Sequence, residues 1–239
     1  MNNNKEASLR SQLIARRTYN RPLNDEGSVF ETFEQTVDRV IGHQRWLWER
    51  ASNYGPSSYE IGTELDELRN LMLERKVLMS GRTLWLGGTE VAKRREASQF
   101  NCSFTCVETV YDLVDVLWLL MQGCGVGFRP VVGQLTGFQK PIKEFEIIRS
   151  TRTTKGGDQN NVETFDPSTG VWTIRVGDSA EAWSKSIGKL AAHKFPANKL
   201  VLDLSQIRPA GERLKGYGWI SSGDAAIAKA YTAIVEILN

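Results

Sequence analysis

Three cysteines are the side chains of this sequence best suited to covalent or redox chemistry. Cys102 and Cys106 lie in the segment SQFNCSFTCVET, and Cys124 follows in GCGVGF. A structural zinc site needs four Cys or His ligands, and the remaining candidates, Cys124, His43 and His193, lack ligand spacing, so a metal site is disfavoured. A redox role for Cys102 needs a second thiol opposite it, and none is obviously placed to supply one. The local pattern therefore favours two buried strand cysteines that behave as small apolar residues.

The hexapeptide GCGVGF has a glycine at every second position. A dinucleotide-binding fingerprint would place such glycines after a strand and at the start of a helix, whereas these follow a helix-like run. The pattern instead indicates close approach to the main chain, because residues without side-chain bulk let another group touch the backbone. That group is either a ligand or a neighbouring strand, and the sequence leaves both alternatives open.

A second candidate site is the flexible loop RSTRTTKGGDQNN, which gathers Arg149, Arg152 and Lys155 beside two glycines. Backbone N–H groups together with cationic side chains can bind phosphate. A solvated hairpin loop is the commoner explanation of such a run. Arg208 and Lys215, in a later loop that also contains glycine, allow the same two interpretations.

The composition excludes several classes of protein. The 239 residues are 41% hydrophobic, which is enough to build a substantial core. Thirty Lys and Arg against 28 Asp and Glu give a net charge of +2, so no charge imbalance indicates nucleic acid or a membrane surface as a partner. The apolar runs fall short of the ~20 residues of a membrane span, and the polar start MNNNKEASLRSQ lacks a signal-peptide core. We therefore expect a cytoplasmic protein with reduced thiols.

Polar residues followed three positions later by an acidic one predict where four helices start. They are Ser28 with Glu31, Thr63 with Asp66, Thr109 with Asp112, and Asp178 with Glu181. Apolar spacing extends the first of these helices over 29–53, the second to about Leu78 and the third through Gln122. The fourth includes Leu190, and a last helix is predicted over 225–238.

Strand-like patterns lie between these helices. Alternating or apolar runs predict strands over 98–107, 142–149, 162–165, 171–176 and 199–204, and Cys102, Phe104 and Cys106 would share one face of the first. The turn DPSTG predicts a hairpin. The sequence thus predicts an α/β protein with a tail and helical region over 1–78 followed by an α/β region over 79–239.

Five segments, in this order, resemble the monomeric, adenosylcobalamin-dependent (class II) ribonucleoside-triphosphate reductases. They are SGRTLWLGGTE (80–90), FNCSF (100–104), LLMQGCGVGF (119–128), LVLDLSQIRPAG (200–211) and YGWISSGD (217–224). The resemblance implies the first part of a ten-stranded α/β barrel with a β-hairpin insertion over about 131–198. Enzymes of this family replace the ribose 2′-hydroxyl by hydrogen, using a cysteine thiyl radical made by homolysis of the cobalamin cobalt–carbon bond.

The resemblance implies a role for Cys102. It matches the family's cysteine on the first barrel strand, which reduces the substrate together with a second cysteine far downstream and ends in a disulfide. Cys106 and Cys124 match no catalytic cysteine of the family. Substrate binding is implied at Ser80, Asn101, Gly125 and Gly127. Binding of a dNTP specificity effector is implied near the helix 110–121 and the insertion, with candidates Asp112, Lys155 and Arg208.

The sequence departs from the family in two respects. Trp219 and Asp224 replace a glycine and a proline that the family usually has in its late loop. The family's thiyl cysteine, second redox cysteine, cobalamin contacts and terminal shuttle cysteines would all lie beyond the equivalent of Asn239. We therefore expect an N-terminal subunit of a split reductase that is inactive without a C-terminal partner chain. That partner would bring most of the adenosylcobalamin contacts. The assembled reductase would depend on a thioredoxin-type reductant. The alternatives are a non-catalytic nucleotide-binding regulatory module and an inactive reductase fragment.

Overall fold

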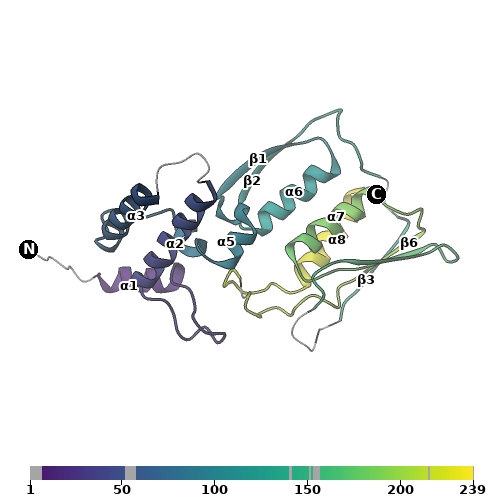
Figure 1. The fold of residues 1–239 in the computed structure, drawn as a ribbon. Coiled ribbons are helices and arrows are strands. Elements are labelled where there is room, and N and C mark those ends of the chain that lie inside the picture. Colours follow the sequence, from purple (N-terminus) through teal and green to yellow (C-terminus); the bar gives the residue numbers. More distant parts are fainter. Residues whose placement is uncertain are drawn as a thin grey trace, which may run out of the picture. The chain divides into compact units, whose positions relative to one another are not determined.

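A computed structural model describes residues 7–51, 58–139, 142–150, 152, 157–214 and 216–238. The chain forms two compact units. Unit 1 consists of residues 1–100 and 215–218, and unit 2 of residues 101–214 and 219–239. Figure 1 shows that the described elements of unit 1 are helical, whereas unit 2 combines helices with strands.

Unit 1 is built around two packed helices, α2 and α3. Its elements are α1 (Leu9–Thr18), α2 (Phe33–Ala51), α3 (Ser58–Leu73), α4 (Gly81–Leu86), α5 (Glu90–Arg94) and the 3₁₀-helix η2 (Glu96–Gln99). Val37 and Val40 of α2 bury their side chains against Leu65 and Met72 of α3 and Leu84 of α4. The apolar spacing that predicted α2 is therefore the face that builds this core.

The predicted start of α2 at Ser28 is wrong. Thr32 begins the helix: its hydroxyl accepts from the Gln35 backbone N–H at 3.2 Å, and the Gln35 side chain accepts from the Thr32 N–H at 2.8 Å. Ser28 instead donates its backbone N–H to Asn24. Glu31, expected to cap the helix from its first turn, points into the unit and is buried.

The predicted start of α3 at Thr63 is also wrong. Thr63 lies inside the helix and donates its hydroxyl to the carbonyl of Tyr59. The helix ends at Leu73, before the predicted end, and Arg75 then adopts a left-handed conformation with a φ of 58°. The segment that follows forms two further short helices, α4 and α5.

Unit 2 begins with a parallel strand pair. Strand β1 (Cys102–Val107) pairs with β2 (Gly125–Pro130), and α6 (Val110–Met121) connects them. The connecting helix is needed because parallel strands cannot be joined by a tight turn. Helix α6 has the predicted capping box of Thr109 and Asp112. The strand is shorter than predicted because η2 occupies residues 96–99, and β2 was not predicted as a strand.

A second sheet has the order β3-β6-β5-β4. Its strands are β3 (Glu144–Ile148), β4 (Val162–Asp166), β5 (Val171–Arg175) and β6 (Lys199–Asp203). β3 and β5 both run parallel to β6, whereas β4 and β5 form the predicted antiparallel hairpin. Asp166 accepts hydrogen bonds from Ser168 and Thr169, which fixes the turn and lowers the pKa of its carboxyl to about 2.

The main core of unit 2 lies between this sheet and two helices, α7 (Ala180–Ala192) and α8 (Ala225–Leu238) (Figure 1). Trp172 and Ile174 of β5 lie in register with Leu200 and Leu202 of β6, and all four are fully buried. Ser179 begins α7, its hydroxyl accepting from the Ala182 N–H. The predicted cap, Asp178, is therefore wrong by one residue.

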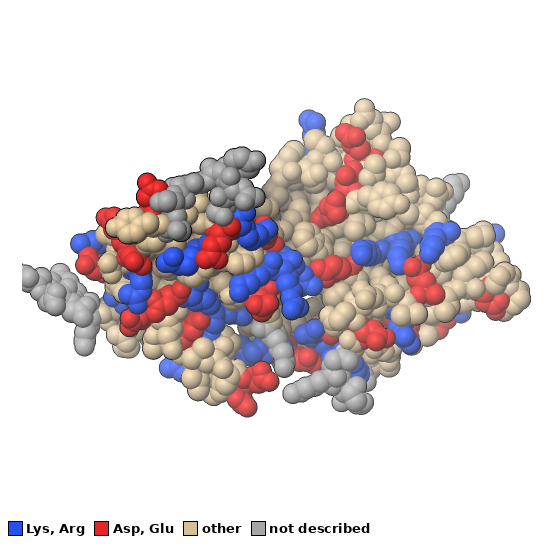
Figure 2. Space-filling view, in the orientation of Figure 1, with Lys and Arg blue, Asp and Glu red and all other residues tan. Residues whose placement is uncertain are grey.

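The protein is thus an α/β protein with a helical N-terminal region. On the visible face of each unit, basic and acidic side chains are interspersed rather than gathered by sign (Figure 2). Among the described residues no helix is long and apolar enough to cross a membrane.

His43 of unit 1 is buried, with 3% of its surface exposed, and stacks on Trp46. The pKa of His43 is lowered, first because burial penalises the charged imidazolium and then because Lys93 and Arg39 repel it. The carboxylate of Glu96 acts in the opposite direction, more weakly than burial. Folded His43 therefore resists protonation more than a free histidine does.

We expect the free energy of unfolding to fall as the pH drops below 6.5, the usual histidine pKa. The unfolded chain takes up a proton there while folded His43 resists it, so stability is lost on acidification, by at most about 1.4 kcal/mol per pH unit and histidine. His193 of unit 2, whose pKa burial also lowers, acts in the same direction. Urea unfolding at about pH 7.5 and pH 5.5 measures the loss. The His43→Gln variant should lose less than wild type, and an equal loss would contradict this origin.

Candidate functional site

The parallel pair in unit 2 brings four of the predicted site residues together. Cys102 is the first residue of β1 and lies in register with Gly125, the first residue of β2. The N–H of Gly125 donates to the carbonyl of Asn101 at 2.8 Å. Gly127 follows on the same strand, in register with Phe104. The site therefore lies where both parallel strands begin.

Cys102 is exposed, as is Phe104 two residues later, whereas the residues between and after them are less so. Because side chains repeat every two residues along a strand, both lie on one face of β1, as predicted. The interpretation of Cys102 as a buried strand cysteine is wrong. The face is apolar as well as exposed at Phe104, whose side chain is 67% exposed. Phe128 of β2, 53% exposed, is in register with Thr105 and therefore lies on the opposite face of the pair.

The other two cysteines have different surroundings. Cys124 is buried, and its Sγ lies 3.5 Å from the hydroxyl of Ser103 and 3.6 Å from the carbonyl of Gly125. Cys106 is half-buried, with its Sγ 3.7 Å from a guanidinium nitrogen of Arg129. All three thiols are free. Across the part of the chain that the structure describes, no group of His, Cys, Asp and Glu could hold a metal ion.

The geometry separates the two explanations of the glycines. A Cβ added at Gly125 would lie 3.6 Å from the Asn101 carbonyl, an ordinary contact. A Cβ at Gly127 would lie 3.1 Å from the ring of Phe104, an exposed side chain that has space to move. The close approach of a neighbouring strand is therefore real, but at position 125 it does not require glycine.

Ser80, the remaining predicted substrate residue, belongs to unit 1. It begins α4: its hydroxyl accepts from the Thr83 N–H at 3.3 Å and lies 3.0 Å from the Thr83 hydroxyl. The side chain of Ser80 is exposed. The helix that Ser80 caps, α4, is short, with six residues.

Asp112, a predicted effector residue, caps α6. Its Oδ2 accepts from the backbone N–H groups of Glu108 and Thr109 and from the Thr109 hydroxyl, at 3.0, 2.8 and 2.9 Å. These hydrogen bonds lower the pKa of the Asp112 carboxyl. Lys155, another predicted effector residue, lies outside the described residues.

Arg208, the third predicted effector residue, belongs to a buried ion cluster. Its Nε donates to Asp178 Oδ2 at 2.8 Å, and Arg152 reaches the same oxygen at 3.3 Å. Arg152 also donates to the Gln206 carbonyl at 2.8 Å, and Glu212 lies 3.7 Å from it. Asp178, the centre of this cluster, was predicted as a helix cap from its spacing to Glu181. Its pairing with Arg152 and Arg208 could not be predicted because both arginines are distant in sequence.

Two family models match the chain. Residues 3–89 match the ribonucleotide reductase alpha domain, and residues 149–238 match the insertion domain of B12-dependent ribonucleotide reductase. The second match overlaps the predicted insertion.

Similar proteins and a solved structure agree with these models. A putative adenosylcobalamin-dependent ribonucleoside-triphosphate reductase of Mycobacterium phage D29 is 28% identical over 95% of this chain and 33% of its own length. The corresponding enzymes of Lactobacillus gasseri and Lactobacillus leichmannii are 28% and 26% identical over 94% of this chain and 35% of theirs.

A crystal structure of a B12-dependent (class II) ribonucleotide reductase matches with a TM-score of 0.75 and 25% identity, covering 95% of this chain and 36% of that one. The chain thus spans about a third of the length of the relatives it matches. The fold, the family models and the relatives all lead to one conclusion: this chain is homologous to the N-terminal portion of the adenosylcobalamin-dependent (class II) ribonucleoside-triphosphate reductases.

Proposed function

We propose that this chain supplies the N-terminal portion of a ribonucleoside-triphosphate reductase and that Cys102 is one of its two substrate-reducing thiols. The observation that carries the proposal is the exposed Cys102 at the start of β1, beside Asn101 and Gly125. A structural cysteine of this size would be buried more often than exposed. Exposure next to residues without side-chain bulk is what a thiol that meets a substrate needs.

The proposed reaction balances with two thiols. The ribose 2′-hydroxyl leaves as water, carbon 2′ gains a hydrogen, and two thiols give up two electrons and form a disulfide. Cys102 supplies one thiol, and the rest of the enzyme, on the same or on a separate polypeptide, supplies the other. A thioredoxin-type dithiol then reduces the disulfide.

Adenosylcobalamin, when bound, would supply the radical that starts this reduction. We propose that its contacts lie mainly in the rest of the enzyme. The chain's own contribution is the reducing thiol and one side of the substrate site.

We place the substrate against Ser80, Asn101, Gly125 and Gly127. The spare room at Gly125 supports this placement, because strand pairing leaves that glycine otherwise unexplained.

We also propose that β1 and β2 are the first strands of a ten-stranded barrel. Exposed apolar side chains support this. Phe104 and Phe128, on opposite faces of the strand pair, and Val132 just after β2, which is 93% exposed, leave apolar surface that the rest of a barrel would cover. The same exposed side chains favour a catalytic assembly over a self-contained regulatory module.

The specificity effector is proposed to bind at the insertion, near Asp112, Lys155 and Arg208. The match of residues 149–238 to a reductase insertion domain supports this. Because Arg208 is bound to Asp178, an effector phosphate would share that guanidinium with the carboxylate.

The test is deoxynucleotide formation from ribonucleoside triphosphates by the complete enzyme, with adenosylcobalamin and a dithiol. We expect activity in wild type, and in Gly125→Ala a KM about tenfold higher with an unchanged melting temperature, because the methyl group fits the strand pair and obstructs only the substrate. Gly42→Ala, on α2 with open space around it, is the matched control. Wild type without activity would refute the function, and an unchanged KM in Gly125→Ala would refute the substrate placement.

A further inference from the structure

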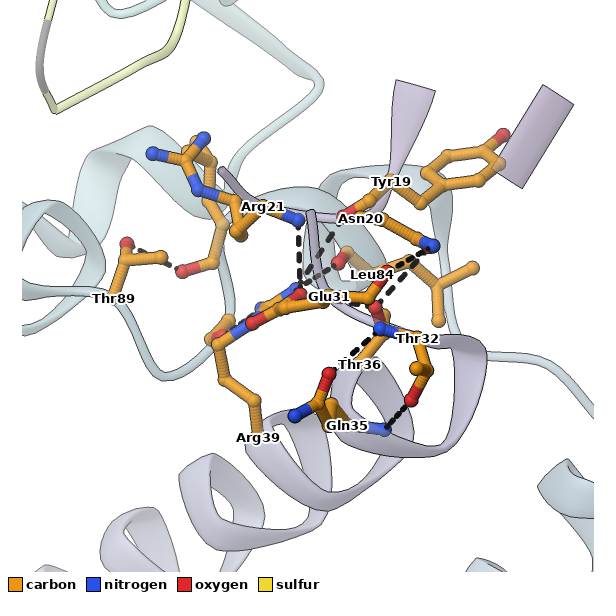
Figure 3. Close-up of polar contacts among 12 residues, drawn as sticks. Tyr19, Asn20, Arg21, Glu31, Thr32, Gln35, Thr36, Arg39, Leu84 and Thr89 are labelled. Carbon is orange, nitrogen blue, oxygen red and sulfur yellow. Dashed lines mark hydrogen bonds and ion pairs between the residues drawn. The ribbon is translucent and has the colours of Figure 1, made fainter. Parts of the chain in front are cut away.

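A buried carboxylate organises the polar interior of unit 1. Glu31 is 8% exposed, and its two oxygens accept hydrogen bonds from three other residues (Figure 3). Oε1 accepts from the Nε of Arg39 at 2.8 Å. Oε2 accepts at 3.0 Å from the Nη2 of Arg39, from the hydroxyl of Thr36 and from the backbone N–H of Arg21. This carboxylate is therefore fully satisfied, as a buried charge must be.

Arg39 connects this carboxylate to helix α4. Besides Glu31, its guanidinium donates to the carbonyl of Leu84 at 2.9 Å and to the carbonyl of Gly87. Leu84 lies in the last turn of α4, and Gly87 directly follows the helix. The last carbonyls of a helix have no partner within it, so Arg39 supplies partners for carbonyls at this end of α4. Figure 3 shows Leu84 beside this polar cluster.

Arg21 connects the same carboxylate to a distant segment of unit 1. Its backbone N–H binds Glu31, while its guanidinium donates to the carbonyls of Gly216 and Tyr217 at 2.6 and 3.1 Å. The ring of Tyr217 in turn lies 6.4 Å from that of Trp85 on α4. Two arginines anchored on one glutamate thus hold α4 and the 216–217 segment together.

Helix α4 depends on such contacts because six residues are too few for a stable helix in isolation. Ser80 starts the helix and Arg39 holds its other end. A displacement at Leu84 or Gly87 would move the whole short helix, together with Ser80, which caps its start.

We infer that Glu31 and Arg39 are positioning residues that fix α4 and thereby orient Ser80 toward the substrate. The role of α4 in the substrate site rests on the proposed function, whereas the anchoring of α4 by Arg39 does not. Neither Glu31 nor Arg39 touches the substrate in this proposal.

The discriminating variant is Arg39→Lys. A lysine keeps the positive charge beside Glu31, but its three N–H donors lie on one nitrogen. It therefore cannot replace the hydrogen bonds that Arg39 makes from three nitrogens to both Glu31 oxygens and to the carbonyls of Leu84 and Gly87. The matched control is Arg69→Lys, whose arginine pairs with Glu34 and Asp38 on the surface of the same unit. Hydrogen–deuterium exchange of peptides covering 81–87 should accelerate about tenfold in Arg39→Lys, the factor for one lost charged hydrogen bond, and not in Arg69→Lys.

The second measurement is the steady-state rate of the complete enzyme. In Arg39→Lys we expect the KM for ribonucleoside triphosphate to rise about tenfold while kcat changes less than about threefold, since the reacting groups are untouched. A merely structural role would lower the melting temperature and leave the KM of the folded enzyme unchanged.

The outcomes separate the two levels of the inference. Unchanged exchange in 81–87, or equal acceleration in Arg69→Lys, would overturn the anchoring of α4. Faster exchange with an unchanged KM would overturn the orientation of Ser80. If wild type forms no deoxynucleotide, the proposed function fails by itself, and the exchange measurement still decides whether Arg39 holds α4.

Discussion

Replacing Cys102 by serine should abolish multiple turnover of the complete reductase, lowering the steady-state rate at least about a thousandfold. Serine has no thiol, so it cannot give up an electron to the substrate and form the proposed disulfide with the second cysteine. Substrate binding should change little, because the side chain is exposed and the substitution is nearly isosteric. The measurement is deoxynucleotide formation at steady state, together with equilibrium binding of the ribonucleoside triphosphate.

Cys106→Ser is the matched control for this variant. Cys106 lies on the same strand, is half-buried, and should tolerate serine with near wild-type turnover. Turnover of Cys102→Ser at the wild-type rate would contradict the assignment of Cys102. Equal loss in both variants would indicate damage to β1 rather than loss of a reducing thiol.

Replacing Asp178 by asparagine should cost unit 2 roughly 3–5 kcal/mol of unfolding free energy, the typical loss when one partner of a buried ion pair is removed. Asp178 is 6% exposed and faces Arg152 and Arg208, whose side chains are 7% and 21% exposed. Asparagine keeps the shape but leaves the two guanidiniums with Glu212 as their one remaining carboxylate partner among the described residues. Urea unfolding at neutral pH measures the change.

Asp158→Asn provides the comparison, since Asp158 pairs with Arg175 on the surface, with 55% and 42% of the side chains exposed. Exposed pairs contribute at most about 1 kcal/mol. A loss below that value in Asp178→Asn would show that the cluster does not hold unit 2 together. The variant also releases Arg208, so an effector that binds there should bind more tightly to the folded fraction.

Elements fixed by neighbouring residues were predictable from the sequence. The box of Thr109 and Asp112 starts α6 because both partners lie within one helical turn. The β4–β5 hairpin was predictable because Asp166 binds residues two and three positions away. The family resemblance was likewise carried by short strings in a fixed order, and it led to Cys102.

Predictions failed where the decisive partner is distant in sequence. Glu31 has the spacing of a helix cap, yet Arg39 and the interior of unit 1 take its carboxylate. Asp178 has the same spacing and is taken by Arg152 and Arg208. A helix cap contributes about 1 kcal/mol, which is less than the cost of leaving a buried guanidinium without a carboxylate. The carboxylate therefore pairs with the buried arginine instead of capping the helix.

The sequence by itself determined the α/β class and most element positions, and it proposed Cys102 as the candidate reducing thiol. Only the tertiary structure decided that GCGVGF contributes a strand, that Cys102 is exposed, and that Glu31 anchors α4 through Arg39. The physical reason is that strand pairing, burial and buried charge pairing depend on residues brought together from distant parts of the chain. Within this cluster, the contact of Arg21 with the carbonyls of Gly216 and Tyr217 joins residues that are farthest apart in the sequence.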